Sequence, residues 1–501
     1  MLRKKQSNSV GALEAEAELS NRSTIKLADV FYDLIDIEDF FETSNRFILV
    51  GGKGSGKTAF ARMHQAQTKN KYNKFTKIIS KGEYDLERVI QDLQMSEDSE
   101  EKNHKELFDW LIINQLIEMM QQHELIKTFK KSDLLEEYKE TNRGIVGISE
   151  REFVEAFKQF NGSVKVTALD NFITANFGKS NKFKYKKAEF TKVLPDLKRV
   201  ARLILSELSD RIPDEDLYFT IVFDDLDQNL KNIKEHRDML MNMIRVAKDY
   251  NLFFSEQENI IVKIALLVRP DILSELDDYT DSFKVIESYK RQIEWFLEEE
   301  YYNGKTMTSL RKMVNLRIMN AVQPKRGAKK IHDAWSEIIN DSTFPQQFKK
   351  PSSFKWCLDR TRYRPRDIID FINVILKHKK QGQKITYQAI QKSLPKYSSN
   401  LWKEIKNELS FYFELDEMNV IENALKNMDD HFRTNQFTTA IEGKTKYEPG
   451  RVLEILFNAS VLGNMENGIY YYKHRETSDN LIKHDLGKDF CVNIGLKNVF
   501  M

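Results

Sequence analysis

The chain contains few of the residues that restrain or interrupt the backbone. Its 501 residues include two cysteines, nine prolines and nineteen glycines. The two cysteines, Cys357 and Cys491, are too few and too far apart in sequence for a disulfide framework or a cysteine-based metal cluster. We expect both to be reduced thiols. The shortage of proline and glycine, together with abundant Leu, Ile, Lys and Glu, predicts a mostly helical protein.

Long apolar runs and an excess of one charge are also missing. No stretch is apolar enough to span a bilayer, and the basic residues 3–5 are not followed by the apolar run of a signal peptide. The formal net charge is only +2, so any site for nucleic acid must be a local patch. The nine histidines are scattered, and none are paired at zinc spacing. We therefore expect a cytoplasmic protein that makes no membrane contact.

What the sequence does contain is a phosphate-binding loop of the pattern G-x-x-x-x-G-K-[ST]. Residues 46–50 before it predict a buried strand, and residues 58–67 after it predict a helix. In this context the backbone N–H groups and the N-terminal end of the helix bind phosphate. Lys57 is expected to reach the β- and γ-phosphates, and the Thr58 hydroxyl to bind Mg²⁺. The predicted cofactors are therefore ATP and Mg²⁺, and the loop consists of Gly51, Gly52, Lys53, Gly54, Ser55, Gly56, Lys57 and Thr58.

A second motif follows the most strongly predicted strand, residues 217–223, which runs into Asp224-Asp225-Leu226-Asp227. Open α/β sheets bind ligands at the carboxyl ends of their strands, so Asp224 is expected to hold Mg²⁺ together with Thr58. Asp225 is placed to orient or activate an attacking water, a role that many ATPases give to Glu. Asp227 either supports the site or caps the segment that follows.

Arginines follow at two further points of the chain. Residues 260–268 predict a third strand, and Arg269 at its end either reaches the γ-phosphate or lies on the surface. Residues 289–300 and 309–322 predict two helices. Pro365 predicts the first turn of another, whose apolar stripe is Ile368, Phe371, Ile372 and Ile375. The dipole of a helix disfavours cations at its N-terminal end. The arginines at the N-terminal end of this helix therefore indicate an anionic partner. Either a nucleotide phosphate or acidic neighbours would satisfy Arg362, Arg364 and Arg366.

Two segments have features that are typical of nucleic-acid binding but that also occur in proteins that bind no nucleic acid. Lys179–Lys187 alternates lysines with aromatic residues, which suits either contact with DNA or RNA or a solvated loop. Near the C-terminus, predicted helices at 402–413, at 418–433 and from Pro449 precede a hairpin predicted from 468–475 and 481–483. This order predicts a winged helix, whose Lys473, His474 and Arg475 would lie near phosphates if it binds DNA, although winged helices also dock proteins.

Together these motifs resemble the FunZ-like bacterial P-loop ATPases, which are related to the STAND, KAP and AAA+ ATPases. The resemblance runs from about residue 25 to the end and matches least in the insertion, residues 81–209, which follows a strand predicted over 75–79. It implies an α/β fold with an ASCE/AAA+-like parallel-sheet core, a large helical insertion, a helical lid and a C-terminal winged helix. It also implies that Arg269 is a strand sensor and that Arg364 or Arg366 is a lid sensor. The residues that carry it are 51–58, 223–227, 266–272 and 362–369.

The expected organisation follows from these assignments. We expect a Mg²⁺-dependent ATPase that switches between conformations and regulates a protein partner. The phage-defence or mobile-element setting rests on kinship alone. A DNA-binding initiator or loader, an ATP-binding scaffold with negligible turnover, and self-association all remain open.

The expected segments are a flexible lead (1–22), a core in two parts (23–80 and 210–275), an insertion (81–209), a lid (276–395) and a winged-helix-like domain (396–501).

Overall fold

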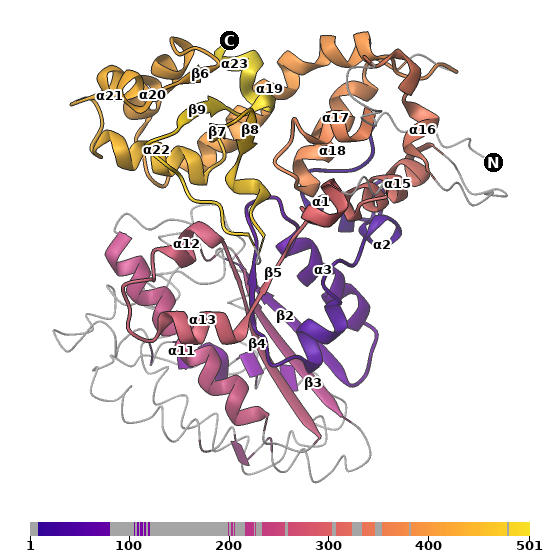
Figure 1. The fold of residues 1–501 in the computed structure, drawn as a ribbon. Helices are drawn as coiled ribbons and strands as arrows, with labels where there is room; N and C mark the ends of the chain where they lie inside the picture. Colours follow the sequence, from indigo (N-terminus) through magenta and orange to yellow (C-terminus); the bar gives the residue numbers. More distant parts are fainter. Residues whose placement is uncertain are drawn as a thin grey trace, which may run out of the picture. The chain divides into compact units, whose positions relative to one another are not determined.

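The computed structural model describes residues 9–80, 216–224, 226, 233–255, 259–302, 307–322, 333–345, 353–379, 382–477 and 480–501, with single positions within 105–120 and 199–205. These residues form two compact units (Figure 1). The sheet unit comprises Ile35–Val50 and Phe60–Arg291, and the helical unit comprises Met1–Leu34, Gly51–Ala59 and Gln292–Met501. Most of the predicted insertion, with Lys179–Lys187, lies outside the described residues.

The sheet unit is built on five strands in the order β2-β3-β4-β1-β5. The pairings β2–β3, β3–β4 and β4–β1 are all parallel. β3 and β4 are nearly continuous apolar runs, as expected of parallel strands that are covered on both faces. Figure 1 shows α11 (Ile233–Phe254) on one side of the strands and α3 (Lys57–Thr68) on the other. The strands are β1 (Ile48–Val50), β2 (Lys74–Ile79), β3 (Leu217–Phe223), β4 (Ile260–Val268) and β5 (Lys290–Gln292).

The strand order sets where the two motif-bearing strands lie. β4 separates β1, which leads into the glycine-rich loop, from β3, which leads into Asp224. Val50 is in register with Val268, and Phe223 with Leu266, so the three strands end at one edge of the sheet. This confirms the predicted α/β fold with a parallel-sheet core, and in such sheets ligands bind at the carboxyl edge.

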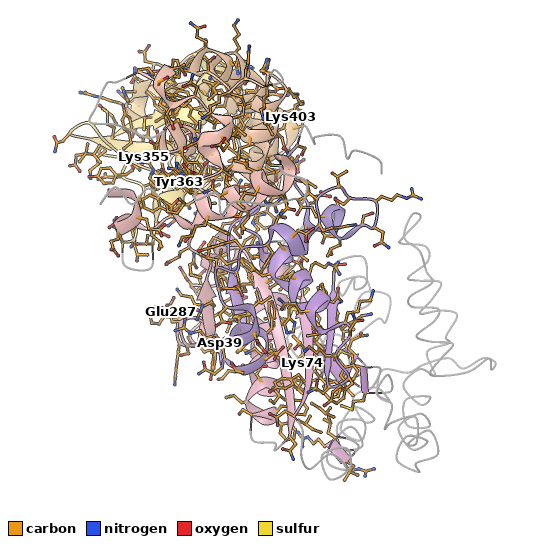
Figure 2. The ribbon with its side chains drawn as sticks, turned by 90° about the vertical axis from the view of Figure 1, so that its right-hand side faces the viewer. Asp39, Lys74, Glu287, Lys355, Tyr363 and Lys403 are labelled. Atoms are coloured by element: carbon orange, nitrogen blue, oxygen red, sulfur yellow. The ribbon has the colours of Figure 1, made fainter. Side chains whose placement is uncertain are left out.

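A buried lysine lies in the middle of β4. The Lys263 ammonium group donates a hydrogen bond to the Ser44 carbonyl oxygen and lies 5.8 Å from the centroid of the Phe40 ring. The short π-helix η1 (Asp39–Thr43), which Figure 2 marks by its Asp39 label, supplies the Phe40 ring beside this lysine. Burial lowers the pKa of Lys263 to about 7, an effect that Asp39 partly opposes. The folded state therefore disfavours the charged form of this side chain.

This arrangement predicts a pH-dependent stability. Because an unfolded lysine has a pKa near 10.4, the unfolded chain binds more protons than the folded chain above about pH 7. We expect the free energy of unfolding to rise by roughly 1–3 kcal/mol between pH 7 and 9, measured by urea unfolding. Lys263→Met should flatten this rise and be more stable at pH 7, whereas Lys284→Met on an exposed position should keep it. Equal slopes in Lys263→Met and the wild type would contradict the prediction.

The first part of the helical unit is a set of packed helices. α15 (Ser309–Val322) has the bounds that the sequence predicted. α18 (Pro365–Leu376) starts at Pro365 and buries its predicted apolar stripe. α19 (Tyr387–Leu409) begins well before the helix predicted from Trp402. Its buried face starts at Ile390 and continues on both sides of the exposed Pro395. The other helices are α1 (Ala15–Leu19), α2 (Leu27–Val30), α14 (Glu298–Tyr302), α16 (Trp335–Ile338) and α17 (Ser353–Leu358).

The C-terminal part of the helical unit is a winged helix, as predicted. It consists of three helices and a small antiparallel sheet in the strand order β6-β9-β7-β8, and β6 lies between the first two of these helices. These elements are α20 (Leu415–Lys426), β6 (His431–Phe432), α21 (Thr434–Ile441), α22 (Pro449–Asn458), β7 (Leu462–Glu466), β8 (Ile469–Tyr471) and β9 (Asp489–Val492).

The hairpin predicted from 468–475 and 481–483 is wrong. β8 pairs instead with β7 around Asn467 and Gly468, whose φ angles are 51° and 77°. An Asn-Gly pair with two positive φ angles is typical of a type I′ hairpin turn. The turn signal therefore lay at the start of the segment that was assigned to a strand.

The N-terminal residues that the structure describes also differ from the mobile lead predicted for 1–22. Val10 is completely buried, and residues 15–19 form α1. Glu18, which is 1% exposed, is paired with Arg317 of α15. Residues 9–19 are therefore a docked part of the helical unit.

Candidate nucleotide site

The glycine-rich loop has the conformation that phosphate binding requires. Gly54 and Gly56 have φ angles of 80° and 102°, in the left-handed region that favours glycine. The Lys57 ammonium group donates a hydrogen bond to the Gly51 carbonyl oxygen at 2.6 Å, so this cation is folded back onto the loop. The Ser55 hydroxyl is buried and has no hydrogen-bond partner among the described residues. A cation and an unsatisfied hydroxyl in one glycine-rich turn fit a phosphate group.

Close packing gives the loop glycines a second role. A Cβ atom on Gly51 would lie 2.4 Å from the Ser55 hydroxyl oxygen. A Cβ atom on Gly54 would lie 2.9 Å from the Cβ of Arg366. The loop can therefore bend this tightly and approach α18 this closely only without side chains at these positions.

The segment after β5 fastens the loop from another direction. The Trp295 indole N–H donates to the Ser55 carbonyl oxygen at 2.8 Å, and the Tyr32 ring lies 6.2 Å from the Trp295 ring. The helix predicted over 289–300 is wrong, because most of this stretch is extended. Ile293 and Phe296 have the three-residue spacing of a helix face, but here they are buried in extended backbone. Trp295 was not anticipated from the sequence, because a single aromatic residue carries no motif.

Arg364 lies beside the loop but is paired with acids. Its Nη1 atom is 3.9 Å from where a Cβ on Gly52 would be. The guanidinium donates to Asp367 at 2.9 Å and to Glu408 at 3.2 Å. Arg362 donates to the other oxygen of Glu408 at 2.9 Å. Two arginines and two carboxylates thus form a buried, mutually neutralised cluster, as the acidic-neighbour interpretation expects for Arg362 and Arg364.

Arg366 connects α18 directly to the loop. Its backbone N–H donates to the Gly54 carbonyl oxygen at 3.3 Å. Its guanidinium donates to Glu404 at 2.6 Å and to the Leu13 carbonyl oxygen at 3.1 Å. The Lys53 ammonium lies 3.9 Å from the same oxygen of Glu404. Neither Glu404 nor Leu13 was anticipated, because neither belongs to a sequence motif.

The remaining predicted site residues belong to the sheet unit. Asp224 follows β3 directly, is 4% exposed, and donates its backbone N–H to the Ile79 carbonyl oxygen at 2.9 Å. Arg269 follows β4 at the start of α12 (Pro270–Ser274), where its Nε donates to Asp271 at 2.9 Å. Asp225 and Asp227 lie outside the described residues, so their predicted roles remain predictions.

The basic triplet that was predicted near nucleic-acid phosphates is engaged within the helical unit. Lys473 is paired with Glu476, and Arg475 with Asp359 at 3.2 Å. The His474 ring is stacked 5.9 Å from the ring of Tyr363, a residue labelled in Figure 2. These contacts hold the triplet against its own chain, and the DNA contact predicted for it stays a prediction.

Comparisons with known proteins agree with part of the expected resemblance. Residues 308–406, which include α15 to α18 and most of α19, match the family model of the FunZ-associated C-terminal helical domain. Among solved structures, the chain is similar to the crystal structure of Cdc6p from Pyrobaculum aerophilum, with 10% identity and a TM-score of 0.26. The similarity covers 95% of this chain and 93% of that chain. No curated protein matches the sequence. Among the described residues, no helix has the length and apolar character needed to cross a membrane.

Proposed function

We propose that this protein is a Mg²⁺-dependent ATPase that acts as a nucleotide-driven switch. The observation that carries the proposal is the loop at 51–58, with its left-handed glycines and the Lys57 ammonium folded onto it. Two further features support it. The sheet has an AAA+-like strand order, and a buried carboxylate, Asp224, follows the strand that the second motif predicts.

The proposed roles follow from the chemistry of each group. The loop N–H groups and Lys57 bind the phosphates, and Thr58 and Asp224 provide the oxygens for Mg²⁺, as the pair of motifs implies. The bound metal would neutralise charge on the β- and γ-phosphates. Asp225 orients the attacking water. Its side chain is shorter than that of the Glu found in many ATPases, which predicts slower turnover rather than weaker binding.

The switching role is supported by the contact between α18 and the loop. Arg366 belongs to the helical segment that matches the FunZ-associated domain, and it touches Gly54. Of the two predicted lid sensors we propose Arg366, because it contacts the loop while Arg364 is held by two carboxylates, and Arg269 stays the proposed strand sensor. The output would be a regulated protein partner, and a setting in phage defence or in a mobile element would rest on the FunZ resemblance alone.

Asp225→Asn tests the catalytic assignment. We expect this variant to bind ATP with unchanged affinity and to hydrolyse it about 10²–10⁴-fold more slowly, because it removes a proton acceptor. Phosphate release under single-turnover conditions measures the loss, and titration with a fluorescent ATP analogue measures the binding. Asp216→Asn, an exposed aspartate just before β3, is the matched control and should behave like the wild type.

The same assay separates an enzyme from a scaffold. If Asp225→Asn hydrolyses ATP at the wild-type rate, then Asp225 is not the group that activates water. If the wild type binds ATP but releases no phosphate in a single turnover, then the protein is a nucleotide-gated scaffold and the proposed hydrolysis is wrong.

A further inference from the structure

The N-terminal segment is fastened to α18 by one side chain. We name residues 9–19 the strap. Asn373 accepts hydrogen bonds from the Ser9 hydroxyl and the Val10 backbone N–H, both at 2.9 Å. Its amide nitrogen donates to the Gly11 carbonyl oxygen at 2.9 Å. Asn373 thus both accepts hydrogen bonds from the strap and donates one to it. The Val10 side chain is completely buried.

A second anchor lies at the other end of the strap. Arg317 of α15 donates to the two carboxylate oxygens of Glu18 at 2.6 and 3.1 Å. Glu18 also accepts the Ala12 backbone N–H at 2.8 Å, which closes the strap into a loop. Both charged side chains are buried, at 7% and 1% exposed. A buried pair of this kind is costly to break on one side, so this anchor is firm.

Between the two anchors, the Leu13 carbonyl oxygen of the strap contacts Arg366, which lies beside the nucleotide loop. Leu13 accepts the Nε–H of Arg366 at 3.1 Å, while Glu404 accepts the Nη1–H at 2.6 Å. Meanwhile the backbone N–H of Arg366 is bonded to Gly54. The same arginine therefore touches the phosphate-binding loop, the strap and α19.

We propose that Leu13 and Glu404 form a latch on Arg366, and that binding of a nucleoside triphosphate opens it. This rests on the proposed function. A triphosphate carries several negative charges, whereas the latch offers one carboxylate and one neutral carbonyl, so the guanidinium and the Lys53 ammonium are drawn toward the phosphates. Opening removes the contact between Arg366 and the strap. The order of residues 9–19 then reports whether the site is occupied, because the ligand interacts differently with the two states.

The closed latch is tested without nucleotide. Hydrogen–deuterium exchange of the peptide covering residues 9–19 is compared in the wild type, Arg366→Gln and Arg451→Gln. We expect about tenfold faster exchange in Arg366→Gln, the effect of losing a charge-assisted hydrogen bond. Arg451→Gln, which removes an arginine paired with Glu454 on α22, should exchange like the wild type. Unchanged exchange in Arg366→Gln would overturn the latch whether or not the protein is an ATPase.

The opening step is tested with Mg²⁺ and a non-hydrolysable ATP analogue, with binding measured separately by calorimetry. Saturating analogue should accelerate exchange of residues 9–19 in the wild type but not in Lys57→Ala. Glu404→Gln should bind the analogue several-fold more tightly, because it removes an internal competitor. Binding without faster exchange, or binding by Glu404→Gln that is no tighter than that of the wild type, would overturn the opening step and leave the proposed function standing. An absence of binding would overturn the proposed function and the opening step, but not the closed latch.

Discussion

Glu408→Ala is expected to lower the free energy of unfolding of the helical unit by about 3–5 kcal/mol. Glu408 accepts hydrogen bonds from both Arg362 and Arg364, and all three side chains are at most 10% exposed. Its removal leaves two buried guanidinium groups with only Asp367 to balance them. An uncompensated buried charge costs far more than the pair contributes, which is why we expect this large effect.

Urea unfolding followed by tryptophan fluorescence measures this loss. The helical unit contains Trp295, Trp335, Trp356 and Trp402, so the signal comes mainly from this unit. Glu454→Ala is the matched control. It removes a partly exposed glutamate paired with Arg451, and should cost no more than about 1 kcal/mol. A similar, small loss in both variants would show that the Arg362–Arg364 cluster does not depend on Glu408.

Lys57→Ala is expected to weaken ATP binding at least about 100-fold while leaving the fold intact. Its ammonium lies 2.6 Å from the Gly51 carbonyl oxygen and is the cation of the loop motif. Loss of one partner from a hydrogen-bonded charge pair costs roughly 2–5 kcal/mol, and about 3 kcal/mol corresponds to 100-fold in affinity.

Isothermal titration with ATP and Mg²⁺ measures the affinity, and the thermal unfolding midpoint checks the fold. Lys69→Ala, at an exposed position just after α3, should bind ATP as the wild type does. A Lys57→Ala variant that still binds ATP with wild-type affinity would show that the nucleotide is held elsewhere, and the proposed function would fail.

The sequence alone determined the parts of this protein that depend on local pattern. The loop at 51–58 was identified because its glycine spacing permits few other structures. The strands ending before Asp224 and Arg269 were identified because continuous apolar runs of this length suit a sheet covered on both faces. Helix α15 was predicted with its observed bounds, and helices followed by a hairpin predicted the winged helix, although the strands of that hairpin were placed wrongly.

The tertiary structure decided which charged groups meet. The three arginines near Pro365 are alike in sequence, yet Arg364 is paired with Asp367 and Glu408 while Arg366 contacts the loop. Their partners are distant in the chain, and charge alone does not select among many carboxylates. The same holds for Leu13, whose backbone oxygen carries no signal in the sequence. Such pairings follow from how helices pack, so only the folded chain determined that the strap, Glu404 and the nucleotide loop share one arginine.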